Sequence, residues 1–331
     1  MIASLVLIVV LALVFDYING MHDAANAIAT GISTRALSPR VAVLMAAALN
    51  FLGAFLSTAV AKTIGGDIAD ASLVHTSTVA AALVAAIIWN LITWAKGIPS
   101  SSSHALIGGI VGAVIAANGV TVLKAAGLTK ILKALVISPL VGFGLGFLIM
   151  LALMWILRNA TPGKINRRFR VAQWFSTSFL AVSHGSNDAQ KSMGIISMAL
   201  VSAGMMDAKH MYIPLWVKIS CAIAMALGTS SGGWRIIKTM GNKMIKLQPT
   251  SGFAAEISSS VVILTASHIG VPVSTTHVIS GSIMGVGTTR RLNAVRWDIA
   301  GQMLLAWVFT IPATALIGFG IESLVSLFVH R

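Results

Sequence analysis

The chain has 331 residues, of which 56% are hydrophobic and only 10% are charged. Soluble domains carry roughly 25% charged residues, so this composition excludes an ordinary water-soluble protein. The net charge of +14 could indicate a nucleic-acid partner, but the basic residues cluster in short segments between apolar runs. Membrane proteins show this pattern on their cytoplasmic side, so we expect no nucleic-acid partner.

Apolar runs follow one another along the chain and predict membrane-spanning helices. They lie at residues 2–18, 41–61, 78–95, 132–157, 213–229, 253–267 and 299–321. Several reach the ~20 residues that a helix needs to cross a bilayer, whereas a membrane β-barrel would show alternating strands of about ten residues. The first run lacks a basic segment and a cleavage site, so we expect a helix rather than a signal peptide. The predicted fold class is an all-α polytopic membrane protein.

Two motifs each occur twice, in the same order. The stretch NGMHDAANA (19–27) returns as HGSNDAQKS (184–192), and GIPSSSSH (97–104) returns as GVPVSTTH (270–277). Two independent pairs in one order indicate an internal duplication. The predicted organisation is a first repeat at residues 1–157, a basic cytoplasmic linker at 158–172 and a second repeat at 173–331.

Equivalent segments of the two repeats differ in charge. The stretch 235–246 is basic, while its counterpart near 62–70 carries one lysine and two aspartates. Equivalent segments on opposite sides of the membrane are what inverted-topology repeats require, and such repeats are typical of secondary transporters. The positive-inside rule then places the basic segments in the cytoplasm, with the protein in the plasma membrane, the inner membrane of a bacterium. These segments are residues 158–170, 235–246 and 290–296.

Each octet is followed by an apolar run that is glycine-rich and too short for an ordinary span. Paired short segments indicate a transporter binding site, and we interpret each octet as the tip of a re-entrant hairpin beside a broken or polar helix. The proline favours a helix start, whose N–H groups and dipole attract anions. Single hydroxyls often bond back to their own helix, but matched clusters favour a tetrahedral oxyanion such as phosphate or sulfate. The hydroxyl donors are Ser101, Ser102, Ser103, Ser274, Thr275 and Thr276.

Carboxylates inside apolar segments are candidates for function because their burial is costly. Asp23 and Asp188 hold equivalent positions in the two repeats, and Asn26 and Lys191 follow three residues later, on the same helix faces. Asn187 precedes Asp188 and is a further candidate ligand. Oxygen ligands suit a small cation or a proton relay. Lys191 could stand in for a bound cation, or it could only neutralise Asp188.

The remaining acidic residues and the histidines give weaker predictions. Glu256 lies in an apolar run without an acidic counterpart in the first repeat, and it is a candidate for the cation or proton path. Asp16 and Glu322 are expected to flank helix ends. The motif histidines could orient hydroxyls, carry protons or only pack, and their spacing predicts no fixed metal site. They are His22, His104, His184 and His277.

The four motifs resemble the signatures of the inorganic phosphate transporter (PiT) family, over about residues 15–290. The resemblance implies two inverted repeats with re-entrant hairpins, a homodimer, no cofactor and cation-coupled uptake of inorganic phosphate. It assigns Asp23, Asn26, Asn187 and Asp188 to cation and phosphate contact. It assigns the phosphate-binding tips to Ser102, Ser103, Thr275 and Thr276.

One position departs from the Na⁺-coupled branch of that family. That branch typically has Asn where this chain has Lys191. The departure resembles the bacterial proton-coupled branch, whose members take up phosphate with a divalent metal, Mg²⁺ or Ca²⁺, as a neutral complex. The family also includes a sulfate-transporting branch, so the resemblance alone leaves the anion open.

These observations favour a proton-coupled secondary symporter that imports inorganic phosphate. A Na⁺-coupled phosphate symporter and a sulfate permease are the alternatives within the same class. An intramembrane Ser/His hydrolase is the alternative from another class, since hydroxyls and histidines stand close in sequence. A nucleophile is needed only once, however, and here the whole set is duplicated. The sequence therefore predicts a transporter and not an enzyme.

Overall fold

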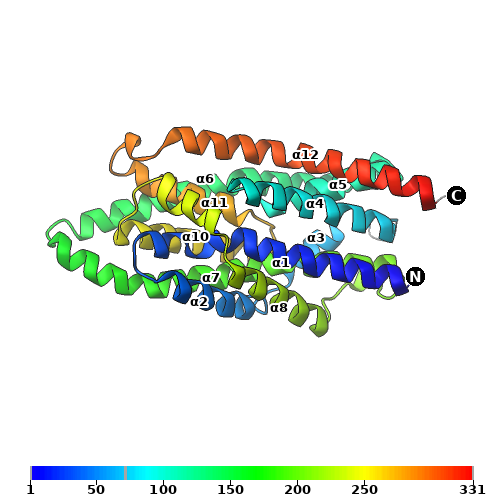
Figure 1. Cartoon of the computed structure of the whole chain (residues 1–331), viewed down its shortest axis with the longest axis horizontal. Coiled ribbons are helices and arrows are strands. Elements are labelled where there is room, and N and C mark those ends of the chain that lie inside the picture. Colours follow the sequence, from blue (N-terminus) through cyan, green and yellow to red (C-terminus); the bar gives the residue numbers. More distant parts are fainter. Residues whose placement is uncertain (1, 71–72, 330–331) are drawn as a thin grey trace.

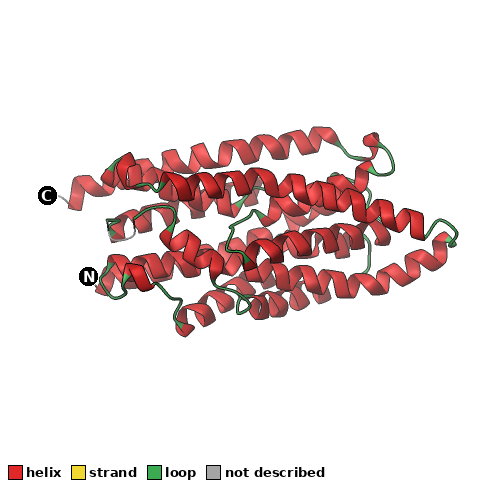
Figure 2. Cartoon of the chain, turned by 180° about the vertical axis from the view of Figure 1, so that it is seen from behind, coloured by secondary structure: helices red, strands yellow, loops and turns green. Residues whose placement is uncertain are grey.

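A computed structural model describes residues 2–70 and 73–329, so the outermost residues of the predicted repeats lie outside the described residues. The described residues form helices joined by loops, with one isolated β-bridge between Ala69 and Leu123 (Figure 2). The first half contains α1 (Ile2–Ser33), α2 (Pro39–Gly53), α3 (Ala59–Gly66), α4 (Thr76–Lys96), α5 (Ser102–Asn118) and α6 (Ala125–Ile156). The second contains α7 (Pro162–Ser202), α8 (Leu215–Ser231), α9 (Trp234–Lys238), α10 (Pro249–His268), α11 (Thr275–Thr288) and α12 (Trp297–Val329). Single turns stand at Val120–Val122, Ala208–His210 and Leu292–Ala294, and a π-helical turn at Thr239–Lys243.

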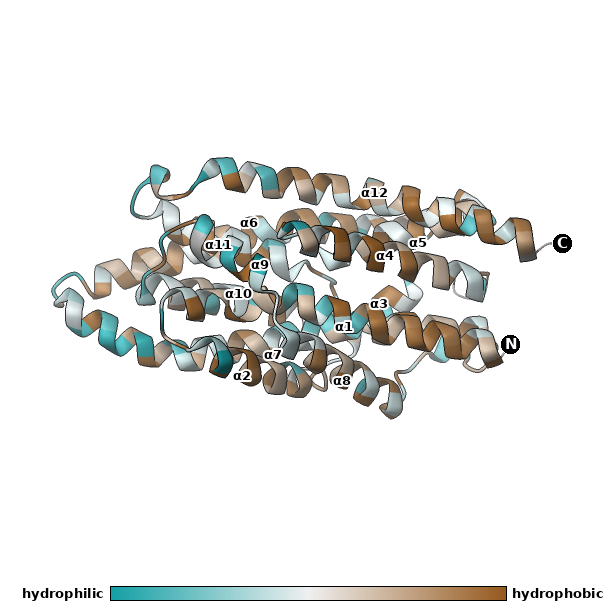
Figure 3. Ribbon diagram, in the orientation of Figure 1, coloured by the Kyte–Doolittle hydropathy of each residue, from teal (hydrophilic) through white to brown (hydrophobic). Residues whose placement is uncertain are grey.

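Several helices are membrane spans by length and composition. Within the described residues, α1, α4, α6 and α12 each qualify alone, and α8 joins the following segment to Gly241 in a fifth, bent by 60°. Large apolar side chains are exposed on these helices, as in Leu140 of α6 and Leu316 of α12, which are 67% and 74% exposed. Figure 3 shows hydrophobic stretches along much of α1, α4 and α12. Such faces are stable only against lipid or another protein. The chain is therefore an all-helical, multi-pass membrane protein.

Two predicted segments differ from the observed helices. The apolar run at 41–61 is divided between α2 and α3 by residues 54–58, and the Ser57 hydroxyl accepts a hydrogen bond from the Ala59 N–H (3.2 Å) at the start of α3. The predicted linker is mostly helical as well. Only residues 157–161 separate α6 from α7, and Pro162 at the first position of α7 favours a helix start. The basic residues from Lys164 onward thus lie on the first turns of α7.

Corresponding helices in the two halves run in opposite directions. Both termini lie at one end of the bundle and the turn between α6 and α7 lies at the other (Figure 1). Helix α1 thus starts where α12 ends, and α6 ends where α7 starts. The packing is also reciprocal, since α5 lies against α12 and α11 against α6, while α1 lies against α8 and α2 against α7. The central pair is α1 and α7, which pack against each other.

Two helical hairpins approach the middle of the bundle from opposite ends (Figure 1). Gly97 directly follows α4, and Gly270 lies two residues after the end of α10. Their φ angles of +65° and +74° favour glycine. The chain then turns back into α5 and α11, which have 17 and 14 residues and are short for a bilayer crossing. The tips of both hairpins therefore lie inside the protein.

The buried apolar side chains form two clusters, and the repeated aspartate motifs lie between them. On α1, one cluster includes Phe15 and residues before it, while the other begins at Ala25. On α7, Ala181 belongs to one cluster and Ala189 to the other. Both helices remain continuous through the motifs, so the motif is polar and not broken. A polar layer thus crosses the middle of the bundle.

Candidate functional site

The tips of the two hairpins contact each other. The Ser103 hydroxyl of the first tip donates to the Val273 carbonyl of the second at 3.0 Å. The rings of His104 and His277 lie 4.4 Å apart, and Trp307 of α12 stacks on His277 at 3.8 Å. Residues that are more than 150 positions apart in the sequence thus form one buried centre.

Each tip opens directly into a helix N-terminus. Ser101 and Ser274 are the N-cap residues of α5 and α11, and their hydroxyls accept hydrogen bonds from the His104 and His277 N–H groups at 3.1 and 3.3 Å. Capping orders the first turn and leaves other N–H groups of that turn available. Two of the six predicted hydroxyls therefore build the tips, while the hydroxyls after them point to the centre.

The first aspartate, Asp23 on α1, is 1% exposed and contacts both tips. One carboxylate oxygen accepts a hydrogen bond from Ser102 at 2.8 Å, and the other lies 3.5 Å from the Thr276 hydroxyl. His22 Nδ1 lies 2.7 Å from Asp23, and its other ring nitrogen lies 3.1 Å from the Thr93 hydroxyl. The histidine of this motif thus orients the carboxylate.

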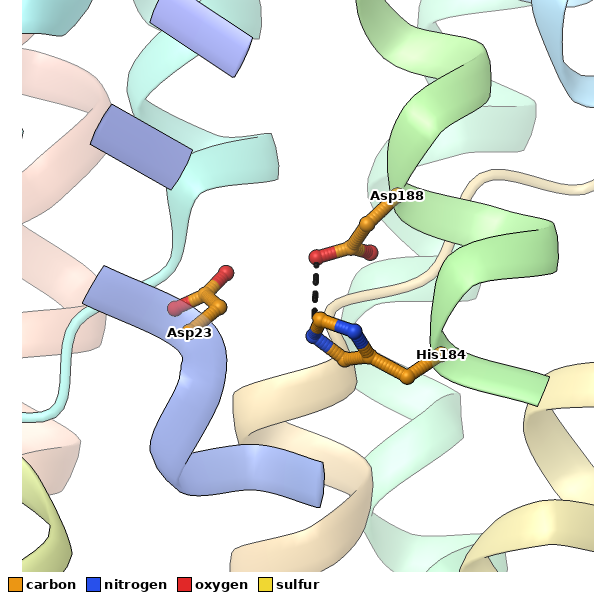
Figure 4. Close-up of side chains that lie close together, drawn as sticks. All are labelled: Asp23, His184 and Asp188. Carbon is orange, nitrogen blue, oxygen red and sulfur yellow. Dashed lines mark ion pairs between the residues drawn. The ribbon is translucent and has the colours of Figure 1, made fainter. Parts of the chain in front are cut away.

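The second aspartate, Asp188 on α7, is fully buried and paired with an amine. Lys191 Nζ lies 3.0 Å from one carboxylate oxygen, which also accepts a hydrogen bond from Asn187 at 2.9 Å. The other oxygen lies 3.4 Å from His184 Nε2 and 3.3 Å from the Thr275 hydroxyl. Asp23, His184 and Asp188 face one another (Figure 4), with one polar atom of each within 4.8 Å of the others.

Two side chains connect the halves through the tips. Lys191 donates to the Ser102 hydroxyl at 3.0 Å, so the ammonium both neutralises Asp188 and faces the first tip. Asn26 donates to Thr275 and Thr276 of the second tip at 3.1 and 2.9 Å. Lys191 therefore pairs with Asp188 and also contacts the first tip, and whether it stands in for a bound cation stays a prediction.

Besides its hydrogen-bond donors, the centre has two acceptors without partners among the described residues. The side-chain amide oxygens of Asn26 and Asn187 are buried, and neither has a hydrogen-bond partner among the described residues. Two carboxylates face one ammonium, which leaves one negative charge if the histidines are neutral. Such a centre can hold a hydroxylated anion only if protons or cations enter with it.

Glu256 lies in a separate polar cluster. It accepts hydrogen bonds from Thr30 at 2.6 Å, Thr177 at 2.9 Å and Gln173 at 3.1 Å, and also from Ser176. Thr30 follows Asp23 by seven residues on α1, a distance of about 10 Å along a helix. The structure therefore does not bring Glu256 to the tips.

The expectation that Asp16 and Glu322 flank helix ends is wrong. Both lie inside long helices, α1 and α12, and they are 0% and 3% exposed. Glu322 accepts a hydrogen bond from Thr78 at 2.9 Å, which fixes α12 to α4. The apolar residues before Asp16 suggested a span that stopped there, whereas α1 continues through the polar motif to Ser33.

Sequence reasoning also missed the residues that support the histidines. Ser100 lies 3.3 Å from His22 and donates to Thr93 at 2.8 Å. On the other side, the Asn50 side-chain oxygen lies 3.2 Å from His184 Nδ1. Ser100 belongs to the first octet, so the motif itself could have identified it as a site residue. Thr93 and Asn50 stand in apolar runs, where only the fold reveals their direction.

The other two motif histidines contact each other and not the aspartates. His104 and His277 line an apolar cavity of about 510 Å³ between α6, α11 and α12, together with Pro139, Phe143 and Trp307. His277 Nε2 has no hydrogen-bond partner among the described residues. This arrangement fits packing between the two tips.

Comparison with known proteins agrees with the motifs. A family model described as "Phosphate transporter family" matches residues 19–318, which include all four motifs. The chain belongs to this family. Its members are transporters and not enzymes. A Bacillus subtilis (strain 168) protein named "Probable low-affinity inorganic phosphate transporter" is 50% identical over 315 residues, covering 95% of this chain and 94% of that protein.

Two further comparisons extend the likeness. A Rhizobium meliloti (strain 1021) protein with the same name is 49% identical over 314 residues, covering 95% of this chain and 94% of that protein. A solved structure titled "The sodium-dependent phosphate transporter" matches with a TM-score of 0.89 and 24% identity, covering 99% of this chain and 100% of that one. At this identity the solved structure establishes the fold, an all-helical transporter fold shared along the whole chain.

Proposed function

We propose that this phosphate transporter family member is a proton-coupled symporter that imports inorganic phosphate across the plasma membrane. The observation that carries the proposal is the meeting of two helix N-termini, with their hydroxyls, at a buried pair of aspartates. Helix N-termini present N–H groups and a positive dipole end to an anion. Tetrahedral phosphate can accept hydrogen bonds from several directions at once, and it fits between two such ends.

The amide acceptors favour phosphate over sulfate. Near neutral pH, phosphate carries at least one hydroxyl group, whereas sulfate carries none. The free amide oxygens of Asn26 and Asn187 can accept a hydrogen bond from that hydroxyl. A site that bonds a substrate hydroxyl rejects the analogue that lacks it, because its own polar groups are left unpaired.

The position of Lys191 supports proton coupling over Na⁺ coupling. Its ammonium lies 3.0 Å from Asp188 and supplies a positive charge that a bound Na⁺ would otherwise bring. One uncompensated carboxylate then remains, and a proton neutralises it without a coordination shell. The cargo species that fits this balance is a neutral complex of phosphate with Mg²⁺ or Ca²⁺, since little charge then crosses the hydrocarbon. The relatives are named low-affinity transporters, and we expect low affinity here.

The transport cycle follows from the arrangement of the halves. Opposed helix directions, reciprocal packing and hairpins that enter from opposite ends support two inverted repeats, 1–157 and 173–331, with re-entrant hairpins. Rocking of the repeats around the central site would expose it alternately to each side. The basic segments 158–170 and 290–296 lie at the end opposite the termini, which supports their cytoplasmic placement. The large apolar outer faces are compatible with a homodimer.

The test is uptake of radioactive phosphate by proteoliposomes, with the pH gradient, Na⁺ and Mg²⁺ varied separately. We expect accumulation to follow an inward proton gradient without Na⁺, and excess sulfate to compete poorly. Asp23→Asn and Asp188→Asn should abolish accumulation, while Asp207→Asn, at a carboxylate that is 59% exposed, should not. Uptake that requires Na⁺ at constant pH would refute proton coupling, and strong inhibition by sulfate would refute the choice of anion.

A further inference from the structure

Asp16 is a buried carboxyl that the central site does not use. It lies on α1, seven residues and therefore about 10 Å before Asp23, and it is 0% exposed. Neither of its oxygens has a hydrogen bond of ordinary geometry with a described residue. Both polar atoms of the Asn19 side chain, one turn later, and the Ser192 hydroxyl of α7 share this condition. Polar atoms without partners thus continue from the central site toward the N-terminal end of α1.

The surroundings of Asp16 come mainly from α7 and α8. Ser192 of α7 and the Cys221 thiol of α8 lie beside its carboxyl group, and the charges of Asp188 and Lys191 act on it. Helix α8 adds Lys218 one turn before Cys221.

The other helices against this part of α1 bring no charge to its level. Within the described residues, α4 carries titratable groups only at its ends, His75 and Lys96, and α2 carries only Arg40 in its first turn. Of Lys191 and Lys218, Lys191 is the one whose charge acts on the Asp16 carboxyl, so Asp16 is neutralised through Lys191 or by a proton.

Lys191 cannot fully serve two carboxylates. Its Nζ is held by Asp188 at 3.0 Å and by the Ser102 hydroxyl at 3.0 Å. An ionised Asp16 would draw the ammonium away from Asp188 and from the first tip, because an unpaired buried charge is very costly. A protonated Asp16 leaves the ammonium where it is, facing the proposed anion site.

We propose that Asp16 is a proton-binding residue of the transporter and that it communicates with the phosphate site through Lys191. This inference rests on the proposed proton coupling. The proton binds to one carboxylate oxygen of Asp16 while the site faces outward, and it leaves from the same oxygen toward the cytoplasm after the repeats have moved. No other bond forms or breaks.

The two binding events should favour each other. Protonation of Asp16 keeps Lys191 at the first tip, where its charge attracts phosphate. By linkage, phosphate held near Lys191 must then favour the protonated form of Asp16 to the same degree. Such reciprocity is what couples an ion gradient to a substrate.

The test compares Asp16→Asn with Asp16→Glu in proteoliposomes. Two measurements are made: accumulation of radioactive phosphate driven by a pH gradient, and exchange of internal for external phosphate at equal pH. Glu322→Gln is the control, since Glu322 is a buried carboxyl of α12 that bonds to Thr78 and lies outside the site. The wild-type protein is measured first, and failure of its proton-driven uptake would refute the proposed function before Asp16 is tested.

One coupled proton and a gradient of about one pH unit sustain about tenfold accumulation. Asp16→Asn should reduce this accumulation to about onefold, because an amide side chain does not take up or release a proton. Exchange of internal for external phosphate at equal pH should persist. The pH dependence of phosphate affinity should also flatten. Asp16→Glu and Glu322→Gln should keep wild-type accumulation. Accumulation by Asp16→Asn equal to wild type would overturn the proposal, and so would loss of exchange together with accumulation.

Discussion

The pair of Lys191 and Asp188 allows a sharp test of how the centre is neutralised. Substitution Lys191→Met keeps the volume and removes the ammonium, so that Asp188 stays buried with the Asn187 and Thr275 donors and with His184 Nε2 at 3.4 Å. Removal of one partner from a buried ion pair costs about 3–5 kcal/mol. Because these two donors remain, we expect the lower end, about 3 kcal/mol of stability.

A double-mutant cycle combines this variant with Asp188→Asn, which removes the carboxylate charge that Lys191→Met leaves unpaired. Asp188→Asn alone leaves the ammonium without a paired negative charge, with only neutral acceptors such as the Ser102 hydroxyl and the new amide oxygen. The double variant strands neither group. Residues in direct contact show interaction energies of about 0.5–3 kcal/mol, and this pair should lie near the upper limit.

Unfolding of the purified variants in detergent, followed by denaturant titration, measures the cycle. We expect each single variant to lose stability and the double variant to recover most of it. Transport should not recover, because the Asp188 carboxylate that contacts the second tip and the ammonium that contacts the first are both gone. Additive losses of stability in the double variant would refute the ion pair, and wild-type accumulation by the double variant would remove both residues from the transport mechanism.

Two further predictions concern the packing and the tips. Gly112→Ala on α5 should destabilise the protein and reduce active yield, because the added Cβ would lie 1.9 Å from the Ala315 carbonyl oxygen of α12. The control Gly320→Ala on α12, whose Cβ would meet nothing within 4 Å, should leave thermal unfolding unchanged. Equal melting temperatures of the two variants would contradict the packing of α5 against α12. The double variant His104→Cys/His277→Cys should be joined by a short crosslinker, because the two rings lie 4.4 Å apart, and the crosslink should block uptake. Neither single cysteine variant should form this crosslink. Its absence from the double variant by mass spectrometry would refute the contact between the tips.

The sequence predicted the polar centre because its parts were duplicated. Ser102 and Thr275 follow matched prolines, and Asp23 and Asp188 stand in matched motifs, so symmetry alone could bring them together. The structure adds which pairs form across the halves, such as Asn26 with Thr276 and Lys191 with Ser102. These contacts depend on how α1 meets the second tip and α7 the first, which no local pattern encodes.

Residues without a counterpart were harder to place. Glu256 was predicted as a candidate for the cation or proton path, and four hydrogen bonds hold it in a separate cluster near the C-terminal end of α1. The basic segment at 158–172 was predicted only as a cytoplasmic linker, because charge indicates the side of the membrane and not the secondary structure. Lys164 and its neighbours instead extend a helix of 41 residues beyond its buried part.

The positions of these carboxyls on α1 and α7 suggest a physical reason for the single lysine. A strictly symmetric centre would carry an amide at residue 191, like Asn26, and two aspartates that need external cations. The lysine breaks that symmetry and supplies one permanent charge, held at 3.0 Å from Asp188. Asp23 then depends on hydroxyl donors and His22, while neither oxygen of Asp16 has a hydrogen bond of ordinary geometry with a described residue. An intramembrane centre of this kind changes its net charge most easily by taking up protons, because its one fixed cation cannot leave.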